Sequence, residues 1–212
     1  MATSAACMRE DVKQLCFAYW RRSHQVPGRF TCPKHSLPLV SIDESSLLPG
    51  GPAQSEQFIA KAELQTSPYC EETTDTRFVV ALLEAMLERF RRPVQQIAVA
   101  GIRAGLGAQG LAYGDRAAKG VLQKRLEKPF SSTWLANAAG KIAARPESIA
   151  RKVERALNPT GSCAAIDLAI VARLAFASAE EALASLGLQG ERSTTPHRPL
   201  QAAALSVEEC GA

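Results

Sequence analysis

Two residues near the start of the chain, Cys32 and His35, have the spacing of a metal-binding pair. A Cys-x-x-His pair on a tight turn can direct a thiolate and an imidazole at one point, which suits a tetrahedral Zn²⁺ ion. Cys7, which lies just before Glu10 and Asp11, can bring a third ligand to the same ion. The sequence therefore predicts a zinc site formed by Cys7, Cys32 and His35.

The stretch between these candidate ligands has an unusual composition. Residues 19–28 are Tyr-Trp-Arg-Arg-Ser-His-Gln-Val-Pro-Gly, and Leu39 follows the Cys-x-x-His pair. Together with the Cys-x-x-Glu-Asp string that begins at Cys7, this resembles the zinc-binding region of the TniQ family. That region has the pattern Cys-Pro-x-Cys-x-x-Glu-Asp, Tyr-Trp-Arg-x-x-His-Gln-Leu-Pro-Gly and Cys-x-x-His-x-x-x-Leu. The resemblance implies that Cys7 is the second Cys of the opening pair, and that residues 19–28 form a loop folded over the metal.

One position departs from the family pattern. Ser4 stands where the resemblance places the first Cys, so a closed zinc site lacks its fourth ligand. Cys16, His24 or water could fill the place, and a decayed site is the remaining alternative. Taken alone, His24 is more often a hydrogen-bonded structural residue, and the other cysteines are ordinary thiols. The resemblance also makes the N-terminus of this chain look shortened.

Charge divides the chain into four zones. Residues 1–41 have a net charge of +4 and residues 42–74 one of −5, whereas fifteen basic and seven acidic residues give residues 75–157 a charge of +8. The basic block favours a polyanionic partner, although a solvated helical surface gives the same count. The expected domains are a zinc-binding region over 1–41, an acidic Ser/Pro/Gly-rich linker over 42–74, a helical DNA-binding region over 75–188 and a flexible tail over 189–212.

Apolar residues recur at helical spacing through residues 75–188 and predict seven consecutive helices. We expect Asp75 to be the N-cap of the first helix and the glycines from Gly105 onward to end the second. The last helix starts at Ser178, whose hydroxyl forms a capping box with Glu181. The first helix has an inward stripe of Val79, Leu83, Met86 and Phe90. The third covers 115–127 with Val121, Leu122 and Leu126 inward, and the fourth starts at Ser132 with Trp134, Leu135, Ala138 and Ile142 buried. The fifth starts at Pro146, and the sixth covers 162–176.

The fifth predicted helix is the first candidate for reading double-stranded DNA. Ile149, Val153 and Leu157 lie on one face, and basic residues lie on the other. With the fourth helix and a short turn it has the length of a helix-turn-helix pair. The candidate contacts to phosphates and base edges are Arg145, Arg151, Lys152 and Arg155. The third helix competes for this role with Arg116, Lys119, Lys124, Arg125 and Lys128.

The fold class is therefore mainly α, with a small N-terminal zinc-binding knuckle before a helical region that contains a helix-turn-helix-like pair. TniQ relatives of the TnsD type have helical regions with a Trp-Leu pair and a Ser-x-Glu-Glu segment, which Trp134-Leu135 and the region ending at Glu181 resemble. The resemblance implies selection of a DNA target site and recruitment of a transposon AAA-type ATPase and transposase. The alternatives are a stand-alone DNA-binding regulator and a protein-only adaptor to a CRISPR effector complex; a homodimer stays open.

Enzymatic activity is not expected. Cys32 and His35 lie in a metal knuckle without an orienting third group, and the chain contains no GxxxxGK[ST] phosphate loop and no acidic cluster of the nuclease type. The first residues lack the features of a secretory signal, and no apolar run approaches about 20 residues. We therefore expect a cytoplasmic protein with no membrane partner.

Overall fold

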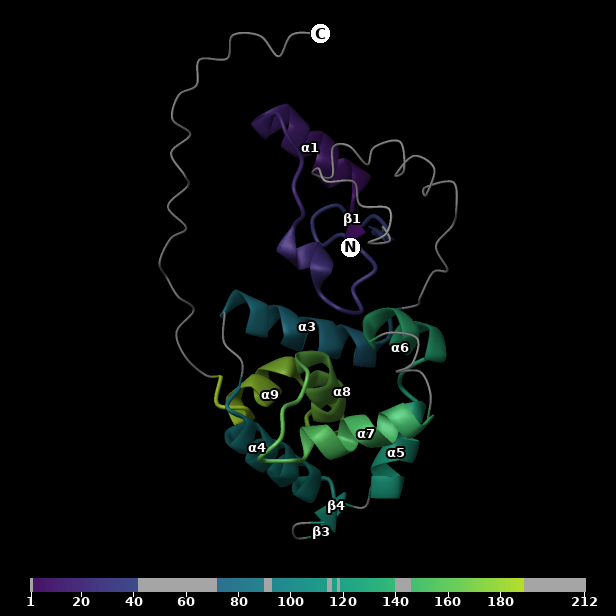
Figure 1. Ribbon diagram of the computed structural model, residues 1–212, viewed down its shortest axis with the longest axis vertical. Helices are drawn as coiled ribbons and strands as arrows, with labels where there is room; N and C mark the ends of the chain where they lie inside the picture. The colour runs from purple at the N-terminus through teal and green to yellow at the C-terminus, as the bar shows by residue number, and fades with distance from the viewer. Residues whose placement is uncertain are drawn as a thin grey trace.

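The computed structural model describes residues 2–41, 72–89, 93–113, 116–117, 119–139 and 146–188, and the structural statements below concern these residues. The chain is mainly helical, which confirms that part of the sequence prediction. A small N-terminal unit lies beside a larger helical body (Figure 1). No described helix has both the length and the apolar character that crossing a membrane requires.

The N-terminal unit is built on one helix and closed by a short antiparallel pair. Helix α1 (Ala5–Leu15) is followed by the 3₁₀-helix η1 (Arg22–Gln25). Strand β1 (Ala2–Thr3) pairs with β2 (Val40–Ser41), with Ala2 opposite Ser41 and Thr3 opposite Val40. Because β1 and β2 lie at the two ends of the unit, their pairing brings the start and the end of the unit together.

The helical body consists of α3 (Thr74–Glu88), α4 (Gln95–Ala108), α5 (Lys119–Glu127), α6 (Ser132–Ala139), α7 (Pro146–Ala156), α8 (Ala165–Ala175) and α9 (Ala179–Ser185). A short hairpin of β3 (Ala112–Tyr113) and β4 (Arg116–Ala117) lies between α4 and α5. Helix α8 is the centre of the core, because it contacts α3, α4, α5, α6, α7 and α9. Its run of buried small and apolar residues from Leu168 to Ala172 lets these neighbours surround it.

Close packing between helices depends on a glycine in α4. A Cβ atom at Gly101 would overlap the backbone carbonyl of Ser185 at the end of α9. Glycine therefore allows α4 and α9 to approach more closely than any larger residue could. Further along α4, Gly105 faces Ala175 and Phe176, and the helix continues past it to Ala108. Helix α4 therefore ends among the glycines from Gly105 onward, as expected, and burial of this face keeps Gly105 itself helical against the intrinsic preference of glycine.

Several expected details of the helices are confirmed. Val79, Leu83 and Met86 are buried in α3, and Leu122 and Leu126 are buried in α5. The hydroxyl of Ser178 accepts a hydrogen bond from the backbone N–H of Glu181 at 3.2 Å. The Glu181 carboxylate accepts in return from the N–H of Ala177 at 3.0 Å. The predicted cap is therefore present, with its return bond one residue earlier than in the standard box.

Other expected details are corrected. The N-cap of α3 is Thr73, whose hydroxyl accepts from the N–H of Thr76 at 3.2 Å, whereas Asp75 lies in the first turn and pairs with Arg173 at 2.7 Å. Val121 is 48% exposed instead of inward. Phe90 and Ile142 lie outside the described residues.

The helix-turn-helix pair is not confirmed. Helix α7 packs mainly against α5 and α8, not against α6. Residues 140–145, which connect α6 to α7 and include Arg145, lie outside the described residues. The described packing therefore defines α7 as an element of a helical bundle.

Candidate metal centre

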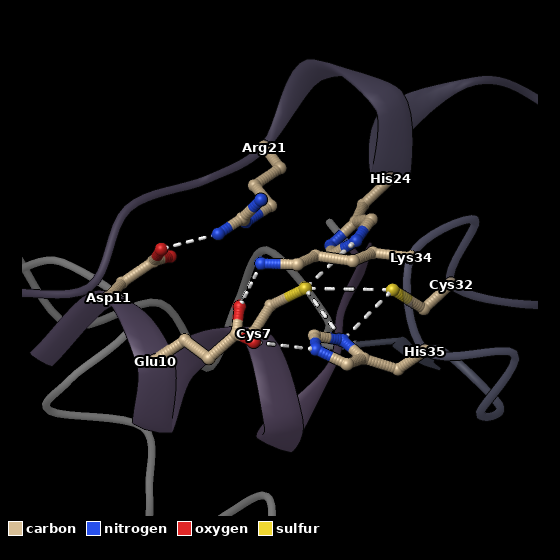
Figure 2. Close-up of polar contacts among 8 residues, drawn as sticks. All are labelled: Cys7, Glu10, Asp11, Arg21, His24, Cys32, Lys34 and His35. Carbon is tan, nitrogen blue, oxygen red and sulfur yellow. Dashed lines mark hydrogen bonds and ion pairs between the residues drawn. The ribbon is translucent and has the colours of Figure 1, made fainter. Parts of the chain in front are cut away.

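Three residues far apart in the sequence bring their ligand atoms together in the N-terminal unit (Figure 2). The Sγ atoms of Cys7 and Cys32 are 3.5 Å apart, and the Nδ1 atom of His35 lies 3.3 Å from the first and 3.5 Å from the second. A tetrahedral ion with Zn–S bonds of about 2.3 Å and Zn–N bonds of about 2.0 Å requires edges of roughly 3.5–3.8 Å. The three atoms thus form one face of such a tetrahedron, and the group can bind a metal ion.

The Cys-x-x-His pair lies on the tight turn that its spacing predicts. The N–H of Ser36 donates to the carbonyl of Cys32, and the N–H of Cys32 donates to the carbonyl of Leu37, both at 2.8 Å. Ser36 adopts a φ of 55°, which lets the chain reverse its direction. Thr31 and Pro38, which flank the turn in the sequence, form an antiparallel β-bridge. The turn therefore fixes the sulfur and the imidazole side by side before any ion is present.

Glu10 orients the histidine ligand. Its carboxylate oxygen Oε1 lies 3.1 Å from Nε2 of His35, and Lys34 donates to Oε2 at 2.5 Å. When Nε2 holds the proton and donates it to Glu10, Nδ1 is free of hydrogen and presents its lone pair to an ion. Glu10 lies three residues after Cys7 on α1, so one helix supplies both a sulfur and the partner of the imidazole.

The two cysteines have opposite electrostatic environments. Burial on its own would raise the pKa of Cys32, but hydrogen bonds from the backbone N–H groups of His35 and Lys34 lower it to about 7. Burial, together with the hydrogen bond to Cys32, raises the pKa of Cys7 to about 11. One thiolate is therefore readily formed at neutral pH, and a cation between the two sulfurs would favour loss of the second proton.

The loop over residues 19–28 covers the ligand group. Asp11 on α1 is 3% exposed and pairs with Arg21 at 2.5 Å, and the Arg21 guanidinium lies 5.4 Å from the centre of the Tyr19 ring. The side-chain amide of Gln25 donates to the carbonyl of Ala2 at 2.6 Å and accepts from its N–H at 3.0 Å. These contacts attach the loop to α1 and to β1.

Of the two side chains considered as a fourth ligand, the structure places His24, and not Cys16, beside the ligand group. Cys16 is exposed at the C-terminal end of α1, and it is not part of the ligand group. His24 is 2% exposed, and its Nε2 atom lies 3.7 Å from Sγ of Cys7. Burial, followed by the charges of Arg21 and Arg29, lowers the pKa of His24, so the imidazole is neutral.

The N-terminal unit is joined to the helical body through contacts that local sequence patterns do not predict. The indole N–H of Trp134 in α6 donates to the carbonyl of Gly28 at 3.2 Å. Arg29 pairs with Glu84 in α3, and Val26 belongs to the main hydrophobic core. Each contact links residues that are more than fifty positions apart, and no local pattern marks such pairs.

The candidate DNA-contacting residues differ in their exposure to solvent. Arg151 and Arg155 are exposed on α7, the latter by 59%. Lys152 is only 7% exposed, and its ammonium pairs with the buried carboxylate of Asp167 in α8. The expectation that Lys152 lies on the solvent-facing side is wrong, because an acidic residue on the neighbouring helix compensates its buried charge. On the competing helix α5, Lys124 and Arg125 are exposed, and Lys128 is exposed in the turn just after it.

Comparisons with known proteins found no match to this chain. No protein-family model matches the chain, and no curated protein or solved structure shows significant similarity to it. The arrangement of Cys7, Cys32 and His35 therefore stands on its geometry alone.

Proposed function

We propose that this chain is a zinc-stabilised, helical DNA-binding protein of the TniQ type, which selects a target site and recruits a transposon ATPase and transposase. One observation supports this proposal above the others: Cys7, Cys32 and His35, which the resemblance pairs as ligands, converge with tetrahedral spacing and have Glu10 behind the histidine. The resemblance to TniQ proteins was based on sequence strings, so their convergence in three dimensions is an independent argument for it.

Zinc is the metal that suits these ligands best. Two thiolates and one imidazole are soft to borderline donors, which select zinc over magnesium and calcium, the partners of oxygen ligands. A structural zinc in a small unit supplies folding free energy directly. The N-terminal unit has only two small buried clusters of its own, around Met8 and around Cys7, so it would depend on such an ion.

DNA binding is the less direct part of the proposal. Arg151 and Arg155 of α7 and Lys124 and Arg125 of α5 are exposed, and these two helices pack against each other. Exposed arginine and lysine residues on adjacent helices offer phosphate contacts without requiring a helix-turn-helix. The proposed DNA-contacting residues are Arg151 and Arg155 of α7, Lys124 and Arg125 of α5, and Lys128 just after α5.

A salt titration of DNA affinity tests this part. Each neutralised phosphate contributes about 0.9 to the slope of log affinity against log salt concentration. Replacement of Arg151 and Arg155 by glutamine should weaken binding to all sequences and lower the slope by up to about 2, whereas Lys13→Gln on α1 serves as the control. A slope near zero for the unmodified chain would remove the DNA proposal and favour the protein-only adaptor.

Recruitment is tested separately. Co-purification of a transposon ATPase or transposase with the DNA-bound chain supports a role in target selection. A chain that binds DNA with a steep salt dependence but retains neither protein would instead be a stand-alone regulator. The two measurements thus distinguish the three candidate functions.

A further inference from the structure

We propose that His24 is the fourth ligand of the metal centre, so that the ion is held by two cysteines and two histidines. This inference rests on the zinc centre of the proposed function and adds a residue that the three-residue group does not contain. The site is then closed and structural, because no coordination position remains for water or substrate.

The first argument is the position of the imidazole. Among the described residues, the His24 ring makes its polar contact with the sulfur of Cys7, at 3.7 Å from Nε2. That distance lies close to the roughly 3.5 Å edge between a sulfur and a nitrogen ligand of a tetrahedral zinc ion. In Figure 2, His24 lies above the line between the two sulfurs and His35 lies below it. His24 therefore contacts the ligand group at Cys7, from another direction than His35.

The second argument is the burial of this side chain. His24 is 2% exposed, and its Nδ1 atom has no hydrogen-bond partner among the described residues. A buried imidazole with one unsatisfied nitrogen costs free energy, on the order of 1–3 kcal/mol for a lost partner. A metal bond at Nε2 would leave Nδ1 without a partner, but it would give the other ring nitrogen a strong bond and would explain why an imidazole occupies an interior position.

The third argument is that the backbone holds His24 in place. The N–H of His24 donates to the carbonyl of Arg21 at 3.0 Å, within η1. Arg21 is fixed by Asp11 of α1, and Gln25 is fixed by Ala2 of β1. Arg21, the N-cap of η1, and Gln25, its last residue, are thus attached to α1 and β1. His24 is not within 4.8 Å of all three ligand atoms, so ligation requires the ring to move toward them.

Other side chains are less suitable as the fourth ligand. Cys16 is exposed at the C-terminal end of α1 and is not part of the ligand group. Ser4 is buried without a hydrogen-bond partner for its hydroxyl among the described residues, but a neutral hydroxyl is not a usual zinc ligand. Asp11 has one unpartnered carboxylate oxygen and is the strongest rival. Its other oxygen pairs with Arg21, which neutralises the charge that a metal would need.

X-ray absorption at the zinc edge of the full chain, loaded with zinc alone, tests the proposal directly. The expected spectrum has two sulfur and two imidazole neighbours. His24→Ala should lose one imidazole and weaken zinc binding, measured by competition with a chromophoric chelator, by more than about 100-fold. That exceeds the roughly 10–100-fold effect expected when only a hydrogen-bonding partner of a ligand is removed. His24→Cys should keep four protein ligands and show three sulfurs.

The controls are Cys16→Ser and Asp11→Asn, and circular dichroism checks that the helical body of each variant is intact. Cys16→Ser should leave the spectrum unchanged. One imidazole in the unmodified chain, an unchanged spectrum for His24→Ala, or loss of an oxygen neighbour in Asp11→Asn would overturn the proposal while leaving the zinc centre in place. A full chain that binds no zinc would overturn the zinc centre itself and this inference with it.

Discussion

The indole nitrogen of Trp134 donates a hydrogen bond to the backbone carbonyl of Gly28, at 3.2 Å and across 106 positions of the sequence. Trp134 is among the most buried side chains and stacks on Phe130, with ring centres 5.1 Å apart. Gly28 closes the loop that covers the metal centre. This bond therefore fastens the N-terminal unit to the helical body at a buried position.

Trp134→Phe tests this attachment. The variant leaves the Gly28 carbonyl without its donor and removes part of a buried ring, which should lower the free energy of unfolding by about 1–3 kcal/mol. Urea denaturation followed by circular dichroism measures the effect. Trp20→Phe, a partly exposed tryptophan in the N-terminal unit, is the matched control and should change stability by much less. Equal effects of the two substitutions would contradict a special role for Trp134.

Substitutions at three glycines distinguish the cost of a positive φ from the cost of steric overlap between an added Cβ atom and a neighbouring side chain. Gly28 has a φ of 81°, and a Cβ atom there would overlap the Trp134 ring. Gly110 has a φ of 67° with open space around it, and Gly107 in α4 has open space and an ordinary helical φ. Gly107→Ala should stabilise by about 0.5–1 kcal/mol, and Gly110→Ala should destabilise by about 1–2 kcal/mol.

Gly28→Ala should destabilise more than Gly110→Ala, because overlap with the Trp134 ring adds to the same backbone cost. Thermal unfolding of the three variants gives the order directly. If Gly28→Ala and Gly110→Ala proved equal, the loop would be free to move away from Trp134, and the close approach of Gly28 to the indole would not be tight.

Cys32→Ser should unfold the N-terminal unit while leaving the helices of the body intact. The substitution removes one of the sulfurs, and a site with fewer ligands cannot supply the folding free energy of a structural zinc ion. Hydrogen exchange with mass spectrometry should show lost protection in residues 2–41 and retained protection in α3, α8 and α9. Treatment with a chelator should reproduce this pattern in the unmodified chain. Unchanged protection around Trp20 would contradict the prediction.

Glu10→Gln should weaken metal binding without abolishing it. Glu10 accepts a hydrogen bond from Nε2 of His35, and loss of such a partner typically costs about 10–100-fold in metal affinity. Chelator competition measures the change. Lys34→Ala removes the cation that pairs with the same carboxylate but leaves Glu10 in place. An effect of Lys34→Ala as large as that of Glu10→Gln would show that the ion pair, and not the bond to His35, is responsible.

The buried pair of Lys152 and Asp167 should be strongly coupled. Lys152→Met or Asp167→Leu alone leaves the other charge uncompensated between α7 and α8, which should cost about 3–5 kcal/mol. The double substitution Lys152→Met/Asp167→Leu replaces both charges by apolar groups and should cost much less than the sum. A double-mutant cycle of these three variants in urea measures the coupling. Additive effects would mean that the two residues act independently, with Arg155, 3.9 Å from Asp167, in place of the lysine.

Local patterns were sufficient for the helices and for the ligand turn. Apolar spacing predicted the buried faces of α3 and α5, Ser178 and Glu181 predicted the cap of α9, and the Cys-x-x-His spacing predicted the turn at Cys32. These features depend on contacts within one or two turns of chain. A sequence displays such contacts directly, because the interacting residues are close neighbours in it.

Tertiary structure alone decided the rest. Lys152 became an interior residue because Asp167 of α8 faces it, and α4 continued through Gly105 because Ala175 and Phe176 cover that side. His24, and not Cys16, came to lie beside Cys7 because Arg21 and Gln25 attach η1 to other elements. Each outcome is set by a partner distant in the sequence, and the free energy of burial and charge pairing at such partners exceeds any local preference.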